Sequence, residues 1–255
     1  MKSSIKAFFL FLLITLFLAS CVSRKKIVYL QGIDDKKSYE NALRYEPTLQ
    51  PDDLLSIIVA AENPEVTLPF NLPQIQGNYE LSASQNNIKT YLIDNDGFID
   101  FPVVGKLKIG GLNRTQAIAK LTEMISLYIE NPILNLRILN FKVSVLGEVT
   151  KPGAYTIPSE RITLLEALSL AGDLSIYGKR DNILVIHEKE GIKTYTRVDL
   201  TKIDILNLSN YYLSQNDIIF VEPNKTKINT SAIGPNANLY ISGLTVLVSL
   251  ILLLK

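Results

Sequence analysis

Short apolar runs, separated by polar turns, fill the middle of the chain and predict a sheet. Residues 54–59 and 133–139 are rich in Leu and Ile and predict two buried strands. Residues 91–101 contain two further apolar runs on either side of a polar turn that ends at Gly97, a sequence typical of a hairpin. We expect these strands, with the helix that follows, to form an α+β domain at residues 44–140.

A helix is predicted from Asn113, where the spacing of apolar positions changes to three and four. Asn113 is a favourable N-cap, and Gln116 stands three residues later, as in a capping box. The helix should continue to Asn131-Pro132 and end there, because proline disfavours helical backbone at the residue that precedes it. Its apolar face consists of Ile118, Leu121, Ile125 and Tyr128.

A second group of strands begins directly afterwards. Residues 141–146 alternate between apolar and polar side chains, as a half-buried strand does, and Gly147 continues them. The tetrad that contains Pro152 and Gly153 predicts a type II turn, because its two central positions favour proline and then a residue with positive φ. Residues 155–157 would return from that turn as the next strand.

The remainder of this group predicts one helix and further strands. Thr163 and Glu166 have the spacing of a capping box, and Gly172 suits the end of the helix that they open. Residues 183–200 contain a Lys-Glu-Gly turn between two apolar runs and predict a hairpin, and one more strand follows. Together these elements predict a small β-grasp-like domain at residues 141–223.

One turn pattern occurs in both predicted domains. Pro51 and Asp53 lie in a polar turn directly before the first strand, and Asp217 ends a similar turn, Ser-Gln-Asn-Asp, before the last strand. Short polar side chains of this kind hydrogen-bond the turn backbone. We interpret the likeness as shared turn mechanics and not as a shared active site.

Residues 1–20 predict a secretory signal peptide. Two lysines precede an apolar run at residues 7–18, which is too short for an ordinary membrane span, and small residues follow it. The sequence Leu-Ala-Ser-Cys is typical of a lipobox, in which Cys21 is diacylated and anchors the mature chain to a membrane. The alternative is an ordinary signal peptide followed by a chance cysteine. Residues 21–43 predict a lipidated polar tether with one short strand at residues 27–30.

The other end of the chain is again strongly apolar. After a linker at residues 224–237, residues 238–255 are dominated by Leu, Val and Ile, and the first charge is Lys255. At about 1.5 Å per residue they reach roughly 25 Å as a helix, so we predict a short transmembrane helix. Four polar residues fall on one face of it: Asn238, Ser242, Thr245 and Ser249. Such a stripe suits a pore lining, a contact between helices, a plain anchor or a soluble docking helix.

Composition and charge exclude several classes of function. Removal of Lys2 and Lys6 with the signal peptide leaves 24 basic against 25 acidic residues, so a nucleic-acid partner is not expected. Cys21 and His187 are the only residues of their kinds, and we expect no disulfide, no metal site and no cofactor. His187 lies in an alternating strand, no nucleophile or phosphate-loop motif is present, and no catalytic residue is predicted.

The order of these motifs resembles the polysaccharide biosynthesis/export family of Wza-type outer-membrane lipoproteins. The likeness covers about residues 45–223 and is carried by PDDLLSIIV, YLIDNDGFIDFPVVGKLKIGG, VSVLGEVTKPGAYTIP and LSQNDIIFVEP. The resemblance implies an export domain at residues 44–140 and one soluble-ligand-binding β-grasp (SLBB) domain at residues 141–223. One departure is that the family's usual Pro-Gly-Asp before the first strand is Pro51-Asp52-Asp53 here.

The resemblance also implies an assembly and a function. The subunits would form a homo-oligomeric ring, an octamer in the best-known members, with both domains in the periplasm. Their C-terminal helices would cross the outer membrane as a barrel that passes capsular or exopolysaccharide to the cell surface. The inner-membrane partner would be a polysaccharide co-polymerase or tyrosine autokinase.

Two other functions stay open from the residues alone. One is a monomeric sugar-binding lipoprotein that uses the β-grasp unit, and the other is a structural scaffold of an envelope complex. The apolar tail favours the channel, because a binding protein already anchored by acyl chains needs no second anchor.

Overall fold

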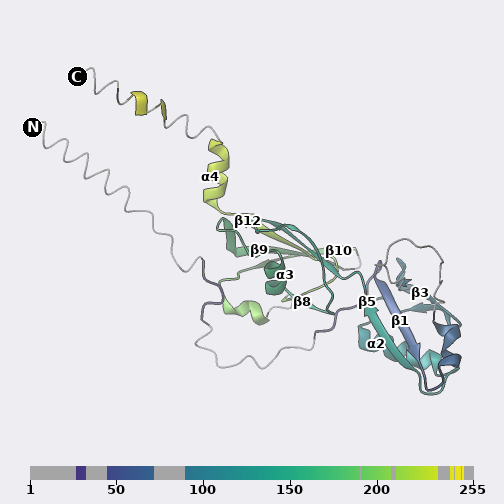
Figure 1. The fold of residues 1–255 in the computed structure, drawn as a ribbon. Helices are drawn as coiled ribbons and strands as arrows, with labels where there is room; N and C mark the ends of the chain where they lie inside the picture. The colour runs from purple at the N-terminus through teal and green to yellow at the C-terminus, as the bar shows by residue number, and fades with distance from the viewer. Residues whose placement is uncertain are drawn as a thin grey trace, which may run out of the picture.

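A computed structural model describes residues 27–32, 45–71, 90–189, 191–207, 211–234 and six residues of the tail, 242, 243, 245–247 and 249. Two lobes lie end to end (Figure 1) and are joined where β5 (Ile133–Ile138) runs into β6 (Lys142–Gly147). We call residues 45–139 the first lobe and residues 141–223 the second. Each lobe has its own apolar core, and this mixed α and β architecture agrees with the predicted fold class.

The sheet of the first lobe is antiparallel and is organised around β1 (Leu54–Ala60), with β2 (Tyr91–Leu92) on one side and β5 on the other. Alternate residues of β1 are buried, because successive strand residues point to opposite faces. The helix α2 (Arg114–Ile125) contacts β5, and its Leu121 and Ile125 join the same core. Full burial of a leucine or isoleucine contributes about 1.5–3 kcal/mol.

The predicted start of α2 is confirmed, and its predicted end is wrong. Asn113 Oδ1 accepts the Gln116 N–H (2.8 Å), and Gln116 Oε1 accepts the Asn113 N–H (3.0 Å), which completes the capping box. The helix stops at Ile125, well before Pro132. Tyr128 therefore leaves the apolar face and is 59% exposed.

The predicted hairpin around Gly97 is wrong in its pairing. The turn forms, since the Gly97 N–H donates to the Asp94 carbonyl (2.9 Å). However, β2 pairs with β1, and β3 (Phe98–Phe101) pairs with β4 (Gly105–Lys108). A turn sequence indicates where the chain reverses, but the partner of each strand depends on which neighbours complete the core.

The second lobe has a five-stranded sheet in the order β10-β9-β12-β6-β7. Its strands beyond β6 are β7 (Gly153–Thr156), β9 (Gly178–Lys189), β10 (Ile192–Val198) and β12 (Ile218–Pro223). The pair β12–β6 is parallel, and the other pairs are antiparallel. The hairpin β9–β10 confirms the prediction for residues 183–200.

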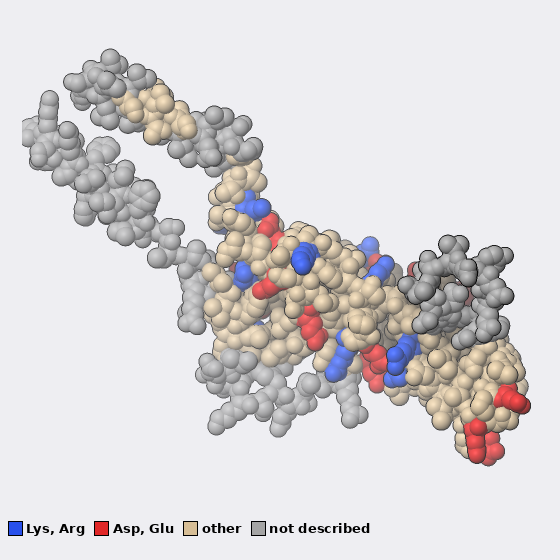
Figure 2. Space-filling view, viewed as in Figure 1, with Lys and Arg blue, Asp and Glu red and all other residues tan. Residues whose placement is uncertain are grey.

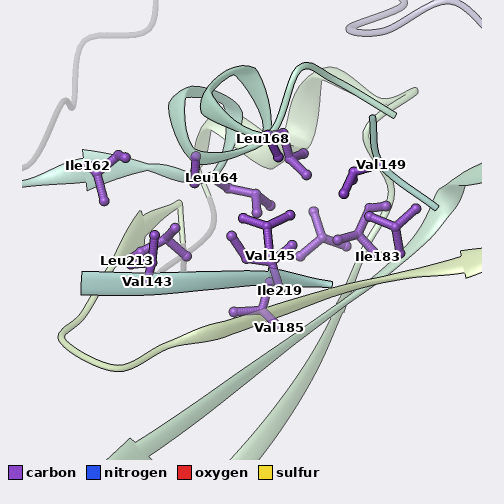
Figure 3. Close-up of a cluster of buried hydrophobic side chains, with 14 of the residues drawn as sticks. Val143, Val145, Val149, Ile162, Leu164, Leu168, Ile183, Val185, Leu213 and Ile219 are labelled. Atoms are coloured by element: carbon purple, nitrogen blue, oxygen red, sulfur yellow. The ribbon is translucent and has the colours of Figure 1, made fainter. Parts of the chain in front are cut away.

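One helix covers one face of this sheet. Figure 3 shows α3 (Leu164–Leu170) above strands whose buried side chains, among them Val143, Val145 and Ile219, point toward it. The predicted capping box opens the helix, because the Thr163 N–H and hydroxyl both donate to Glu166 Oε2 (2.8 Å each). Gly172 follows the helix with φ +73°, the left-handed conformation expected there.

The remaining short elements complete the two lobes. They are η3 (Pro64–Phe70), β8 (Ile162–Thr163), η4 (Ile203–Asn207), β11 (Tyr212–Leu213) and α4 (Lys225–Ile233). β8 and β11 pair with each other. The predicted linker at 224–237 thus begins with a helix, which Asn224 caps through its side-chain oxygen and the Lys227 N–H (3.0 Å).

Gly147 is required by the packing of β6 against β12. Its φ is +89°, and a Cβ placed on it would lie 2.1 Å from the carbonyl oxygen of Val221. By contrast, Gly153 does not have positive φ and belongs to β7. The predicted type II turn at Pro152 and Gly153 is therefore wrong. The loop between β6 and β7 is held by α3 instead: the N–H groups of Thr150 and Lys151 donate to the carbonyls of Asp173 and Ala171, which follow that helix.

The strand predicted at residues 27–30 is not formed. The N–H groups of Leu30 and Gln31 donate to the carbonyls of Leu200 and Thr201 (3.0 and 2.8 Å). Tyr29 and Leu30 pack against the core of the second lobe. These backbone bonds, an isolated parallel β-bridge between Gln31 and Lys202, and the two partly buried side chains hold this part of the predicted tether.

Cys21 and Asn238 lie outside the described residues. The described part of the tail is helical at Ser242, Thr245 and Ser249. Two of the stripe hydroxyls bond their own helix, Thr245 to the Ser242 carbonyl (3.1 Å) and Ser249 to the Thr245 carbonyl (2.8 Å). Among the residues that the structure describes, no helix has the length and apolarity needed to cross a membrane.

Candidate functional site: the cleft between the lobes

Asn140 joins the two lobes and is bonded to both. Its side-chain amide donates to the Asp52 carbonyl (2.8 Å), and its side-chain oxygen accepts the Leu54 N–H (2.9 Å) in the first lobe. Its backbone carbonyl accepts the amide of Gln215 (2.9 Å) in the second lobe. Gln215 also accepts the Lys142 N–H (2.7 Å), so the connection between the lobes is held at both ends.

Asn140 is bonded by residues of the two similar turns that the sequence contains. Asp53 Oδ2 accepts the Gln50 N–H, and Asp217 Oδ2 accepts the Ser214 N–H, each at 2.8 Å. The third residue of each turn is left-handed, with φ +68° at Asp52 and +64° at Asn216. Asp and Asn tolerate this conformation better than most residues, which explains how Asp52 can occupy the place that glycine takes in the resembled family.

The second oxygen of each turn aspartate has a different environment. Asp217 Oδ1 lies 2.7 Å from His187 Nδ1, whereas Asp53 Oδ1 is buried without a hydrogen-bond partner. Burial raises the pKa of Asp217, against the opposing effects of the Ser214 N–H and His187. Burial raises the pKa of Asp53 to about 6; the Gln50 N–H opposes this shift, and Asp52 adds to it. His187 therefore satisfies one oxygen of Asp217.

A cleft of about 1040 Å³ lies between the lobes, and Leu139 and Phe141, on either side of Asn140, line it. One wall is β5, which is an edge strand of its sheet. The Leu139 N–H donates to Leu54 on β1, so the alternate residues Leu136 and Ile138 direct their backbone groups to the free edge. The opposite wall is the segment 156–161, which follows the edge strand β7.

Charged side chains from both lobes meet in this cleft, and Figure 2 shows acidic and basic groups side by side where the lobes join. Arg114 Nε lies 3.2 Å from Glu160 Oε1 across the cleft and donates to the Leu136 carbonyl (2.9 Å). Glu46 accepts the Thr115 hydroxyl (3.0 Å). Arg137 and Arg161 also line the cleft.

Aromatic rings support one end of the cleft. Tyr45 and Tyr212 are stacked, with centroids 5.0 Å apart and planes 8° apart. The guanidinium carbon of Arg161 lies 5.4 Å from the Tyr212 ring centroid. The Tyr45 hydroxyl is 3.0 Å from that of Ser214. Arg161 is therefore held by cation–π attraction beside the turn that ends at Asp217.

The predicted motif residues divide between the joint and two close contacts. Pro51, Asp53 and Asp217 belong to the turns that hold Asn140. Gly97 lies against Gly110, where an added Cβ would be 2.6 Å from the Gly97 Cα. Gly147 makes the close approach to β12 described above. None of these residues lines the cleft between the lobes.

The cleft residues themselves were missed by the sequence reasoning. Arg137 stands in a strand pattern and Arg161 in a loop, and neither belongs to a motif. The adjacent tyrosines Tyr211 and Tyr212 were a weak signal of a surface contact. Among the described residues, no group of three or more His, Cys, Asp and Glu side chains is placed to hold a metal ion.

Two family models match the chain in tandem. Residues 41–139 match the polysaccharide biosynthesis/export protein model, and residues 141–221 match the SLBB domain model. The residue between the two matches is Asn140, which also joins the two lobes.

Two curated proteins are similar to this chain. Both are described as EPS I polysaccharide export outer membrane protein EpsA. The protein of Ralstonia solanacearum is 27% identical over 176 residues, which are 67% of this chain and 46% of that protein. The protein of Ralstonia nicotianae is 30% identical over 128 residues, which are 48% of this chain and 33% of that protein. The chain thus spans less than half the length of the curated relatives it matches.

Proposed function

This chain belongs to the polysaccharide biosynthesis/export family, and we propose that it is an outer-membrane subunit that passes polysaccharide to the cell surface. The observation that carries the proposal is the tandem order of the two matched units, each with its own core. The family is one of export proteins and not of enzymes. The exported polymer would be a capsular polysaccharide or an exopolysaccharide.

The two ends of the chain support a particular placement in the envelope. Cys21 follows a predicted signal peptide with lipobox residues, so acyl chains on its thiol and amine would anchor the mature chain. The two lobes would then lie in the periplasm. The apolar residues 238–255 would cross the outer membrane as one helix per subunit, and the helices of a closed ring would form the barrel around the polymer.

Energy for export would come from outside this subunit. The sequence contains no phosphate-binding loop, so transport through the ring would be passive. An inner-membrane polysaccharide co-polymerase or tyrosine autokinase would supply the polymer and control its length.

Surface polysaccharide in a deletion strain tests the proposal. The strain without this chain should retain polymer inside the envelope, and the full-length gene should restore surface polysaccharide. A gene that lacks residues 238–255 should yield a folded, lipidated protein that does not restore it. Normal surface polysaccharide in the deletion strain would contradict an export role.

Particle symmetry separates the channel from a monomeric sugar-binding or scaffold lipoprotein. Electron microscopy of the detergent-extracted protein should show closed rings of one rotational symmetry. A monodisperse monomer in detergent, checked by light scattering, would favour the alternatives.

A further inference from the structure

The cleft between the lobes holds two arginines without ion-pair partners among the described residues. Of its acidic groups, Glu160 pairs with Arg114, and Glu46 accepts the Thr115 hydroxyl. Arg137 and Arg161 line the same cleft, and both are exposed. A guanidinium group presents parallel N–H donors that match the two oxygens of a carboxylate. The cleft therefore has unused capacity for an anion with this geometry.

Arg161 is positioned in advance of any ligand. Its guanidinium group lies over Tyr212, and that ring also stacks on Tyr45, which is fixed in turn by Ser214. Restricting a long side chain in this way lowers the entropy lost when it binds a ligand. Arg137 is positioned by its strand, since it pairs with Ser56 on β1.

The cleft also offers the neutral hydrogen bonds that a sugar requires. The free edge of β5 presents the backbone N–H and carbonyl of Ile138, which suit the hydroxyl groups of a saccharide. The volume of about 1040 Å³ is at the upper end of the range of ligand sites. A short oligosaccharide segment can therefore lie along the strand edge.

We propose that this cleft binds an acidic segment of the exported polymer, with Arg137 and Arg161 as the groups that recognise its carboxylates. The proposal rests on the export function proposed above and names its substrate class, a polysaccharide that carries carboxylate groups on its sugars. Arg114 and Glu160 form an ion pair across the site, and Asn140 is bonded to both of the lobes that form its walls.

Binding by the detergent-solubilised full-length protein tests the site. The probes are hexagalacturonate, hexaglucuronate and fully methyl-esterified hexagalacturonate, which keeps the same sugar and has no charge. At least one charged probe should bind at least tenfold more tightly than the ester, and more weakly as salt increases. Equal affinity for the ester, or no binding of either charged probe, would overturn the proposal.

Three variants assign the binding to the cleft. Arg137→Gln and Arg161→Gln should each weaken binding of the charged probe at least tenfold and leave the affinity for the ester unchanged. Lys193→Gln removes an equal surface charge from β10, which is the edge of the five-stranded sheet opposite β7. This variant should bind the charged probe as tightly as the wild type. Unchanged binding in both arginine variants, with wild-type melting temperatures, would exclude the cleft as the site.

Export in cells separates this inference from the proposed function. The double variant Arg137→Gln/Arg161→Gln should restore less surface polysaccharide than the wild type in the deletion strain. If the deletion blocks export and the double variant restores it fully, the export function stands and the cleft inference fails. If the deletion does not block export, the proposed function fails, and the binding assay still decides whether the cleft takes acidic saccharides.

Discussion

His187 and Asp217 face each other between β9 and the start of β12, with His187 Nδ1 2.7 Å from Asp217 Oδ1. Asp217 is only 3% exposed. A buried carboxylate oxygen without a partner costs about 1–3 kcal/mol or more. This pair is therefore a structural element of the joint between the lobes, because Asp217 also holds the turn that contacts Asn140.

Replacement of His187 by alanine should destabilise the second lobe by about 1–3 kcal/mol. Burial already raises the pKa of Asp217, and His187 opposes that rise, so the pKa should rise further in the variant. A raised pKa reduces stability as pH increases through it. The loss should thus be larger at pH 7 than at pH 4, measured by urea unfolding. Glu188→Ala, on the exposed side of β9, is the control; equal losses at both pH values would contradict the assignment.

Asp53→Asn should change the pH dependence of stability. The pKa of Asp53 is raised from its ordinary value to about 6 by burial. The protonated Asp53 carboxyl group therefore contributes fully to stability below about pH 4, and this contribution is lost as pH rises through about 6. A rise of the pKa from 3.8 to about 6 corresponds to at most about 3 kcal/mol of unfolding free energy.

The Asp53→Asn variant cannot ionise at this position, so its unfolding free energy should lack this decline between pH 4 and pH 7. Asp100→Asn, on the exposed side of β3, should keep the wild-type slope. Parallel curves for the wild type and the Asp53→Asn variant would show that this carboxyl group does not set the slope.

Gly147→Ala should be among the most damaging single substitutions in the second lobe. The added methyl group would meet the Val221 carbonyl at 2.1 Å in a backbone with φ +89°, and we expect a loss of about 3–5 kcal/mol. Gly191→Ala is the matched control, because Gly191 has φ +77° and nothing within 4 Å of an added Cβ. The Gly191→Ala variant should lose only about 1–2 kcal/mol of unfolding free energy. Similar melting temperatures for both variants would refute a role for the contact with Val221.

Asn140→Ala should loosen the joint between the lobes. The variant loses two side-chain hydrogen bonds to the first lobe, each worth about 0.5–1.5 kcal/mol. Spin labels at Asp100→Cys and Lys193→Cys, in a Cys21→Ser background, should report a broader distance distribution than in the otherwise unchanged chain. Asn135→Ala, on an exposed position of β5, should leave the distribution unchanged. An equally narrow distribution in the Asn140→Ala variant would show that other contacts hold the lobes.

Thiol labelling should show what the polar stripe of the tail contacts. If Ser242, Thr245 and Ser249 line a water-filled lumen, cysteines at these positions should react with a membrane-impermeant reagent. Cysteines at Gly243, Val246 and Leu247 should be protected. The hydroxyls of Thr245 and Ser249 already bond their own helix, so a seam between helices would bury them at little cost. Uniform protection of all six positions would therefore favour the seam.

Local signals in the sequence predicted local structure well. Both capping boxes, at Asn113 and Thr163, form with the expected partners, because a cap needs only residues three positions apart. The family resemblance was also visible from ordered motifs alone. The strand partners on either side of the Gly97 turn were not predictable in this way, because β2 pairs with β1 and β3 pairs with β4. The backbone at Gly153 also differed from the prediction, and the residues before it bond the end of α3.

The candidate site was not predictable in the same way. Arg137 and Arg161 come from different lobes, and nothing in the spacing of the two residues indicates that one cleft contains both. Asn140 likewise lies in no motif, and its importance follows from bonds to residues 75 to 88 positions away.

The sequence by itself determined where α2 and α3 begin, which strand faces are apolar, and that two small α+β units follow one another, because these depend on the spacing of neighbouring side chains. It also placed Asp53 and Asp217 in similar turns. Only the tertiary structure decided that the two turns meet at Asn140, that His187 satisfies one aspartate and leaves the other without a partner, and that two arginines share a cleft. Such relationships depend on packing between distant segments, which one-dimensional spacing does not specify.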